Sequence, residues 1–299
     1  MPSLINYTNC PSCNSQQISL ALAAKDYTVS NEVFEIWHCK TCTLRFTQQV
    51  PDATAIVPYY QSSAYISHTD TKDGLINKLY HLVRNFTLKS KRNLISQQTN
   101  LSKGNLLDIG AGTGAFAYTM QQANWQVTGL EPDANARKIA ADKFAIQLQN
   151  PQELYQLQPN TFDAITMWHV LEHVHDLHGY LEKFASILKP TGKLFIAVPN
   201  YTSYDAAYYK QHWAAYDVPR HLYHFSPTAI NKLAQAKGFK VEAYKPMWFD
   251  SFYVSMLSEQ YKNDKQNLLM AYIIGCISNV KTMLNVKKCS SIIYVLSKQ

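Results

Sequence analysis

The chain has 299 residues, of which 46% are hydrophobic and 16% charged, and its formal net charge is +7. This length suits one large domain, or one domain with a small module, and the apolar content is sufficient for a sizeable core. The basic residues are scattered and the densest group, residues 89–92, is short, so we expect a solvated helix face there and consider a nucleic-acid partner unlikely.

No secretory signal is visible at the start of the chain, and no run of about 18 apolar residues is present. We therefore expect a cytoplasmic protein without a membrane span. The most apolar candidate, residues 268–277, is too short to span a bilayer. We expect it to form a buried helix, with peripheral membrane contact as the alternative.

Four cysteines near the N-terminus form two C-x-x-C pairs, Cys10 with Cys13 and Cys39 with Cys42. Each pair can direct two thiolates at one ion, and two pairs complete a tetrahedral site. Disulfides fit poorly in a chain without an export signal, and a redox motif needs only one pair. Residues 1–50 are therefore predicted to form a small ribbon around a structural zinc ion, with no open position for catalysis.

Residues 51–100 are expected to be a linker that ends in an amphipathic helix, because Leu75, Leu79, Leu82 and Phe86 recur at helical spacing. From residue 101 to 299, strands and helices alternate, which predicts an α/β fold with a doubly wound, mostly parallel sheet. The sequence predicts seven strands, at residues 106–109, 126–131, 145–148, 164–168, 194–198, 240–244 and 291–296.

A glycine-rich turn follows the first of these strands, with Gly110, Gly112 and Gly114 at alternate positions. Glycines let the backbone turn sharply and let a ligand approach the main chain. The next strand ends in Glu131, and an acid at that position can accept hydrogen bonds from ribose hydroxyls. The pattern predicts a cofactor that contains a nucleoside.

Four segments between residues 105 and 199 resemble, in the right order, the motifs of class I S-adenosyl-L-methionine (SAM) methyltransferases. They are the x-G-x-G-x-G turn after Asp108, the acid Glu131, the segment FDAITMWHVLEH at 162–173, and LKPTGKLFIAVP at 188–199. A dinucleotide fingerprint would instead place its third glycine at Ala115. The resemblance implies the Rossmann-like methyltransferase fold, with an antiparallel last strand, and SAM as cofactor.

The resemblance also implies which residues surround SAM. The glycine loop would contact the methionine part, Glu131 the ribose and Pro132 the adenine. Family members carry an acid where this chain has Asn150, so a contact to adenine there would come from the backbone. The candidate cofactor-binding residues are Asp108, Gly110, Gly112, Gly114, Glu131, Pro132, Asn150, Met167, Trp168 and His169, the last two beside the sulfonium.

The segment from His169 to His173 permits three interpretations. It spells the inverted zincin pattern H-x-x-E-H, but it follows a buried strand within methyltransferase motifs, which disfavours a peptidase. Glu172 and His173 could help bind a divalent ion, as in some quinone-type O-methyltransferases with a similar segment, although those carry an acid in place of His169. Alternatively, both side chains cap the following turn. His169 itself is a candidate general base.

An aromatic-rich insertion at residues 201–226 is the predicted acceptor-binding segment. Aromatic side chains supply flat walls, and an arginine supplies a fork for a carboxylate or phosphate. We expect Arg220 to orient an anionic group and His221 to accept a proton, with a packing loop as the alternative. The candidate substrate residues are Tyr204, Trp213, Arg220, His221 and His224.

The sequence thus predicts a SAM-dependent methyltransferase that acts on a small-molecule or glycan-linked acceptor. A zinc ribbon ahead of such a domain resembles the layout of sugar C-methyltransferases of deoxysugar pathways, which are longer. One alternative is a methyltransferase that binds nucleic acid through the ribbon, but the ribbon is not notably basic. Another is a non-catalytic scaffold, which would need neither the glycines nor Glu131.

Overall fold

The computed structural model describes residues 3–61, 75–263, 265 and 267–299. From residue 105 onward strands alternate with helices, as the sequence predicts. The α-helices of this region are α3 (Ala115–Gln121), α4 (Ala134–Phe144), α5 (Leu177–Ile187), α6 (Tyr204–Tyr209), α7 (Pro227–Ala236), α8 (Asp250–Asn263) and α9 (Leu268–Leu284). Its short 3-10 helices are η2 (Pro151–Gln156), η3 (Leu171–His173), η4 (Lys210–His212), η5 (Ala214–Tyr216) and η6 (Val286–Lys288).

The central sheet has the strand order β11-β12-β9-β8-β6-β7. Neighbouring strands from β7 through β6 and β8 to β9 are parallel, whereas β12 runs antiparallel to both β9 and β11. The predicted α/β class and the antiparallel last strand are therefore confirmed. The strands are β6 (Asn105–Ile109), β7 (Gln126–Leu130), β8 (Phe162–Trp168), β9 (Leu188–Pro199), β11 (Phe239–Pro246) and β12 (Ser291–Lys298).

The prediction of a seventh strand at residues 145–148 is wrong, because this sheet has six strands. Ala145 ends α4 in the left-handed conformation, with φ 56°, and Asn150 already caps η2. The few residues between these caps form a single parallel bridge, from Gln149 to Leu130. That bridge still brings Asn150 beside the end of β7.

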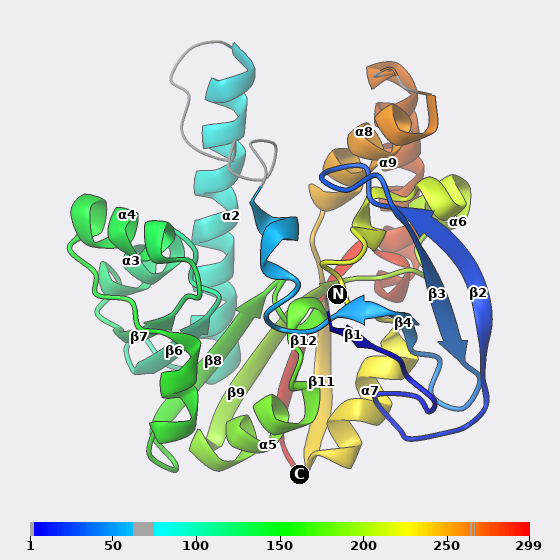
Figure 1. Cartoon of the computed structure of the whole chain (residues 1–299). Coiled ribbons are helices and arrows are strands. Elements are labelled where there is room, and N and C mark those ends of the chain that lie inside the picture. The colour runs from blue at the N-terminus through cyan, green and yellow to red at the C-terminus, as the bar shows by residue number, and fades with distance from the viewer. Residues whose placement is uncertain (1–2, 62–74, 264, 266) are drawn as a thin grey trace.

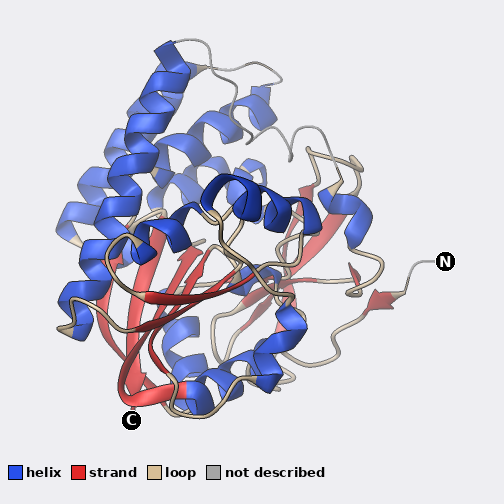
Figure 2. Ribbon diagram, turned by 90° about the vertical axis from the view of Figure 1, so that its left-hand side faces the viewer, coloured by secondary structure: helices blue, strands red, loops and turns tan. Residues whose placement is uncertain are grey.

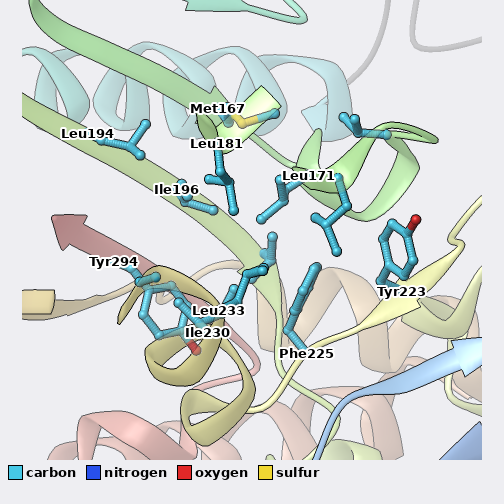
Figure 3. Packing of buried hydrophobic residues seen from close by; sticks show 14 of the residues in the cluster. Met167, Leu171, Leu181, Leu194, Ile196, Tyr223, Phe225, Ile230, Leu233 and Tyr294 are labelled. Carbon is cyan, nitrogen blue, oxygen red and sulfur yellow. The ribbon is translucent and has the colours of Figure 1, made fainter. Parts of the chain in front are cut away.

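Helices cover both faces of the sheet, as a doubly wound fold requires (Figure 2). On one face, Leu181 of α5 and Leu233 of α7 pack on Met167, Leu194 and Ile196 of β8 and β9 (Figure 3). On the other face, a second buried cluster joins the sheet to α3 and to α2 (Leu75–Thr99), through Ile95, Leu106, Phe116, Met120 and Phe195.

Helix α2 (Leu75–Thr99) is the helix predicted before the sheet. The side chains of Leu75, Leu79 and Leu82 lie outside the described part of the chain. Phe86 is exposed and contacts Phe249 edge to face, with ring centroids 6.0 Å apart. The helix therefore covers the sheet with its carboxyl-terminal half and faces the start of α8 with Phe86.

The N-terminal strands form two further small sheets. Strands β1 (Leu4–Ile5) and β5 (Val50–Pro51) pair with each other and precede the short helix η1 (Val57–Tyr60). The second sheet has the order β10-β4-β3-β2, and its strand β10 (Tyr223–His224) comes from the aromatic insertion. The other strands are β2 (Ile18–Lys25), β3 (Val33–Cys39) and β4 (Arg45–Thr47).

The insertion at 201–226 packs between the N-terminal sheet and the helix pair α8–α9. Tyr209, Trp213 and Tyr216 of the insertion share one buried cluster with Ile36 of β3 and Ile274 of α9. Figure 1 shows α8 and α9 on the opposite side of the molecule from α3 and α4. Within the described residues, no helix combines the length and apolar character needed to cross a membrane.

Candidate functional site

The turn after β6 is built from three glycines in the left-handed region, with φ 67° at Gly110, 54° at Gly112 and 78° at Gly114. A Cβ at Gly110 would lie 2.4 Å from Val170, and one at Gly114 would lie 2.9 Å from Ala140. At Gly112, in contrast, no described atom lies within 4 Å of a built Cβ. Gly112 is therefore where a ligand can approach the main chain.

Glu131 follows β7 and reaches the glycine turn. Its Oε2 accepts a hydrogen bond of 2.7 Å from the backbone N–H of Gly112, and its Oε1 accepts one of 2.9 Å from Asp133. Burial raises the pKa of Glu131, and these two backbone donors partly offset that rise. Pro132 is exposed beside it, and the backbone N–H of Glu131 donates to Gln149, next to Asn150. The structure thus brings the predicted ribose and adenine residues together.

A buried acid precedes the glycine turn, and a lysine lies over the end of β8. Asp108 accepts a hydrogen bond of 2.7 Å from Thr166, and burial raises the pKa of Asp108 to about 7. Lys91 of α2 places its Nζ 4.3 Å from the centroid of the Trp168 ring, and burial lowers the pKa of Lys91 to about 8. The sequence prediction missed Lys91, because residues 89–92 were expected to form a solvated face.

His169 lies at the end of β8 with an unusual φ of 56°. Its Nε2 is 3.0 Å from Oδ2 of Asp250, and its Nδ1 is 3.4 Å from Oε1 of Glu172. Burial would lower the pKa of His169, but these two carboxylates raise it to about 10. An imidazolium cannot accept a proton, so the geometry speaks against the predicted role of His169 as general base. Asp250 carried no sequence signal, being 81 residues further along the chain.

We predict that His169 stays protonated through neutral pH. Because folding raises its pKa, the charged pair stabilises the fold fully below the ordinary pKa of 6.5, and this contribution is lost as pH rises through about 10. Titration of the His169 ring by NMR, with Asp250→Asn as the comparison, should show a high pKa that falls in the variant. A wild-type ring that titrates near 6.5 would contradict the pairing.

Glu172 forms a second cluster with His173 and His221. Ligand atoms of the three side chains lie within 4.8 Å of one another. Glu172 is fully buried, and apart from the ion pair of its Oε1 with Nδ1 of His169, no described group gives its carboxylate oxygens a hydrogen bond. His173 donates from Nδ1 to the carbonyl of Arg220, and His221 donates from Nδ1 to that of Ala215. This orientation leaves both Nε2 atoms as the ligand atoms, so the three side chains could hold a divalent ion.

Arg220 does not face an open site. It is fully buried, and its guanidinium donates to Asp26 at 3.1 Å, to Asp217 at 2.6 Å and to the carbonyl of Tyr59 at 3.0 Å. With its donors directed at protein acceptors, Arg220 cannot also orient an acceptor molecule. The burial therefore speaks against the predicted role, and the residue joins the N-terminal segment to the insertion.

The other predicted acceptor residues are also packing residues. Trp213 is buried and donates from Nε1 to Asp205 at 2.8 Å. Tyr204 is half-buried and packs against the buried cluster that contains Trp213. His221 and His224 are both buried, and burial lowers the pKa of His224. The interpretation of residues 201–226 as a packing loop thus fits better than a substrate loop, and His221 lacks the exposure that a proton acceptor needs.

A small pocket lies between α2 and the junction of β11 with α8. It is lined by Phe86, Thr87, Ser90, Lys91, Leu94, Pro246, Met247, Trp248, Phe249, Asp250 and Ile293. Two lining residues contact side chains at the end of β8, Lys91 on Trp168 and Asp250 on His169. The pocket therefore adjoins the residues expected beside the sulfonium.

The four N-terminal cysteines converge as predicted. Sγ of Cys10 is 3.5 Å from that of Cys42, and Sγ of Cys13 is 3.6 Å from that of Cys39. Zinc–sulfur bonds of about 2.3 Å would place the sulfurs of a tetrahedral site about 3.8 Å apart. Three of the four residues are buried, so the cluster has the donors, spacing and enclosure of a structural zinc site.

Comparison with known proteins agrees with this geometry. The model of the methyltransferase domain family matches residues 81–244, which is more than half of the chain. A ubiquinone biosynthesis O-methyltransferase of Xanthomonas euvesicatoria pv. vesicatoria (strain 85-10) is 26% identical over 169 residues, covering 52% of this chain and 71% of that protein. One of Xanthomonas oryzae pv. oryzae (strain PXO99A) is 29% identical over 140 residues, 44% of this chain and 59% of that protein.

Among solved structures, magnesium protoporphyrin IX methyltransferase from Synechocystis PCC 6803, with bound S-adenosylhomocysteine (SAH), is similar in fold. The TM-score is 0.53 and the identity 16%, covering 83% of this chain and all of the other. This similarity supports the fold alone. Together with the family match, the glycine turn and Glu131, it leads to one conclusion: the chain belongs to the methyltransferase domain family and is a SAM-dependent methyltransferase.

Proposed function

We propose that this methyltransferase acts on a hydroxyl oxygen of a small, flat molecule bound in the pocket between α2 and the β11–α8 junction. The observation that carries the proposal is the position of Lys91, which lines the pocket and lies over the Trp168 ring. The similarity to proteins named O-methyltransferases supports oxygen as the acceptor atom.

The lining of the pocket, whose volume is about 70 Å³, suits one aromatic ring of an acceptor. Phe86, Trp248 and Phe249 provide apolar walls, and Asp250 and Lys91 are its charged groups. Small-molecule sites typically combine apolar walls with a few placed polar groups of this kind. A glycan-linked acceptor, which the sequence also permitted, would find fewer polar partners here.

The proposed chemistry assigns a separate task to each group. SAM, when bound, supplies a methyl group activated by a positively charged sulfur. Trp168 and the pocket walls align the acceptor and exclude water, which is the main requirement of a direct displacement. Lys91, with a pKa of about 8, is partly neutral at physiological pH and can accept the hydroxyl proton. His169 holds Asp250 in place.

We expect Lys91→Met to reduce methyl transfer about 10²–10⁴-fold, the usual contribution of a general base. Transfer from methyl-labelled SAM to a panel of phenols and catechols, followed across pH, would measure it. In the wild-type protein the rate should rise with pH as Lys91 deprotonates, with an apparent pKa of about 8. Lys91→Met should lose that dependence and keep its SAM affinity.

The matched control is Lys89→Met, two residues away on the exposed side of α2, which should behave as wild type. If Lys91→Met transferred methyl groups as fast as Lys89→Met and the wild-type protein, the role of Lys91 would be contradicted. Label that enters RNA or a sugar nucleotide, but no phenol, would refute the proposed acceptor class and favour the nucleic-acid or glycan alternative.

We also propose that the cluster of Cys10, Cys13, Cys39 and Cys42 holds one structural zinc ion. Metal analysis of protein purified without chelator should find one zinc per chain. Cys39→Ser should lose the metal and lower the melting temperature, because the thiolates cross-link two turns of the N-terminal sheet. Cys276→Ser, far from the cluster, is the control. Protein that is folded and free of zinc would refute the site.

A further inference from the structure

Helix α9 is more apolar on its outward face than on the face that packs against the protein. Its buried residues are Ala271, Ile274, Gly275, Ser278 and Thr282. The large exposed apolar side chains include Leu268, Leu269, Tyr272, Val280, Met283 and Leu284. At about 100° per residue, these six lie on one side of the helix. Surface helices of globular proteins show the opposite arrangement.

Small residues fix this orientation of α9. A Cβ at Gly275 would lie 2.5 Å from the ring of Phe252, so α9 approaches α8 as closely as a glycine allows. Ser278 donates a hydrogen bond of 2.8 Å to the buried Asp205. The leucines cannot turn inward without breaking these contacts. The sequence predicted a buried helix at 268–277, but only its small-residue face is buried.

Positive charge borders this apolar face. Between residues 250 and 290 the sequence has five lysines and three acids. Lys262 and Lys265 lie before α9, and Lys281, Lys287 and Lys288 lie in its last turn or just beyond, all exposed. Three of the five contact other elements: Lys262 lies over the Tyr208 ring, Lys287 over the Tyr244 ring, and Lys288 donates to the carbonyl of Thr202. Lys265 and Lys281 are the two for which the described residues offer no partner. Of the acids that the structure describes, Glu259 is buried and Asp250 is paired with His169. The outward surface therefore combines leucines with lysines.

This combination favours one occupant. An apolar helix face flanked by lysines is typical of helices that lie in the surface plane of an anionic bilayer, where each nearby lysine adds to the attraction. A second copy fits less well. A two-fold contact would bring the same lysine-bordered surface together with itself, and the described acids of this segment are not exposed to compensate.

We propose that α9 docks the protein on anionic membrane surfaces, with its outward leucines in the boundary between headgroups and acyl chains. Lys265 and Lys281, one near each end of the helix, would contact lipid phosphates. Tyr272, which stacks on Phe252 with ring centroids 5.7 Å apart, would lie at the level of the headgroups. The contact is peripheral and uses the folded protein as it is.

Sedimentation with lipid vesicles tests the proposal. Wild-type protein should bind vesicles of phosphatidylcholine with one third phosphatidylglycerol, bind pure phosphatidylcholine weakly, and dissociate at high salt. The combined variant Leu269→Glu, Met283→Glu and Leu284→Glu should lose at least about tenfold in partitioning. The reason is that three apolar side chains that would enter the bilayer surface become charged. Lys265→Gln with Lys281→Gln should lose about fivefold per lysine.

The control carries Leu20→Glu and Val33→Glu, which exchange two exposed apolar side chains on β2 and β3. It should bind vesicles as wild type does, and an unchanged melting temperature would show that each variant is folded. Equal partitioning of the triple variant and the wild type would overturn the proposal. A wild-type dimer in light scattering, dissociated by the triple variant and indifferent to vesicles, would assign the face to a second copy instead.

Discussion

Replacing Arg220 by alanine is expected to destabilise the protein by about 3–5 kcal/mol, the usual result of removing one partner from a buried ion pair. The guanidinium contacts Asp26, whose side chain is inaccessible, and Asp217, whose side chain is 24% exposed. Asp26 lies 194 residues before Arg220 in the sequence. Without Arg220, the buried Asp26 carboxylate would have lost its cationic partner. Urea unfolding followed by circular dichroism would measure the loss.

The matched control for Arg220→Ala is Arg92→Ala on α2, where the guanidinium contacts only the neighbouring Asn93 among the groups described. It should change stability little.

Burial raises the pKa values of Asp26 and Asp217, but their hydrogen bonds and Arg220 outweigh this and lower both. Their contribution is therefore complete above the ordinary pKa and is lost only as pH falls through the lowered values. An Arg220→Ala protein with unchanged stability and lost methyl transfer would restore the acceptor role.

Glu131→Ala is expected to weaken SAM binding by about 1–3 kcal/mol, the cost of leaving buried hydrogen-bonding groups without a partner. The carboxylate lies within hydrogen-bond distance of Gly112, at the one glycine of the turn where the main chain is open to a ligand. Calorimetric titration with SAM and SAH would measure the change. Both ligands should be affected, because both carry the ribose.

Asp142→Asn is the control for Glu131→Ala, since Asp142 is exposed on α4, the helix that follows Glu131. Its SAM affinity should equal that of wild type. The same affinity in Glu131→Ala would refute the assignment of the ribose site. A large drop in melting temperature would instead show that Glu131 acts mainly by holding the glycine turn.

The glycine turn and the position of Glu131 beside it could be predicted from the sequence because their signals are local. A buried strand, three glycines and a helix lie within residues 105–121, and Glu131 follows one strand later. Steric limits on backbone conformation enforce that pattern over short distances. The cysteine pairs are equally local, since each pair spans four residues and needs only one tight turn.

The proposed acceptor side could not be predicted, because its contacts join distant parts of the chain. His169 pairs with Asp250, and Lys91 reaches Trp168 from a helix that precedes the sheet. Polar residues of the insertion looked available for substrate, yet Arg220 is paired with Asp26. In a single sequence, a buried ion pair and a binding site use the same residue types, and only the tertiary structure separates them.

A structure of the protein crystallised with SAH would test the central claim most directly. SAH is expected at the glycine turn, with its ribose hydroxyls on Glu131, its amino-acid end against Gly110 and Gly112, and its sulfur beside Trp168. The pocket that contains Lys91 should open onto that sulfur. SAH bound elsewhere, or a sulfur closed off from Lys91 and facing the buried Arg220 instead, would contradict the account.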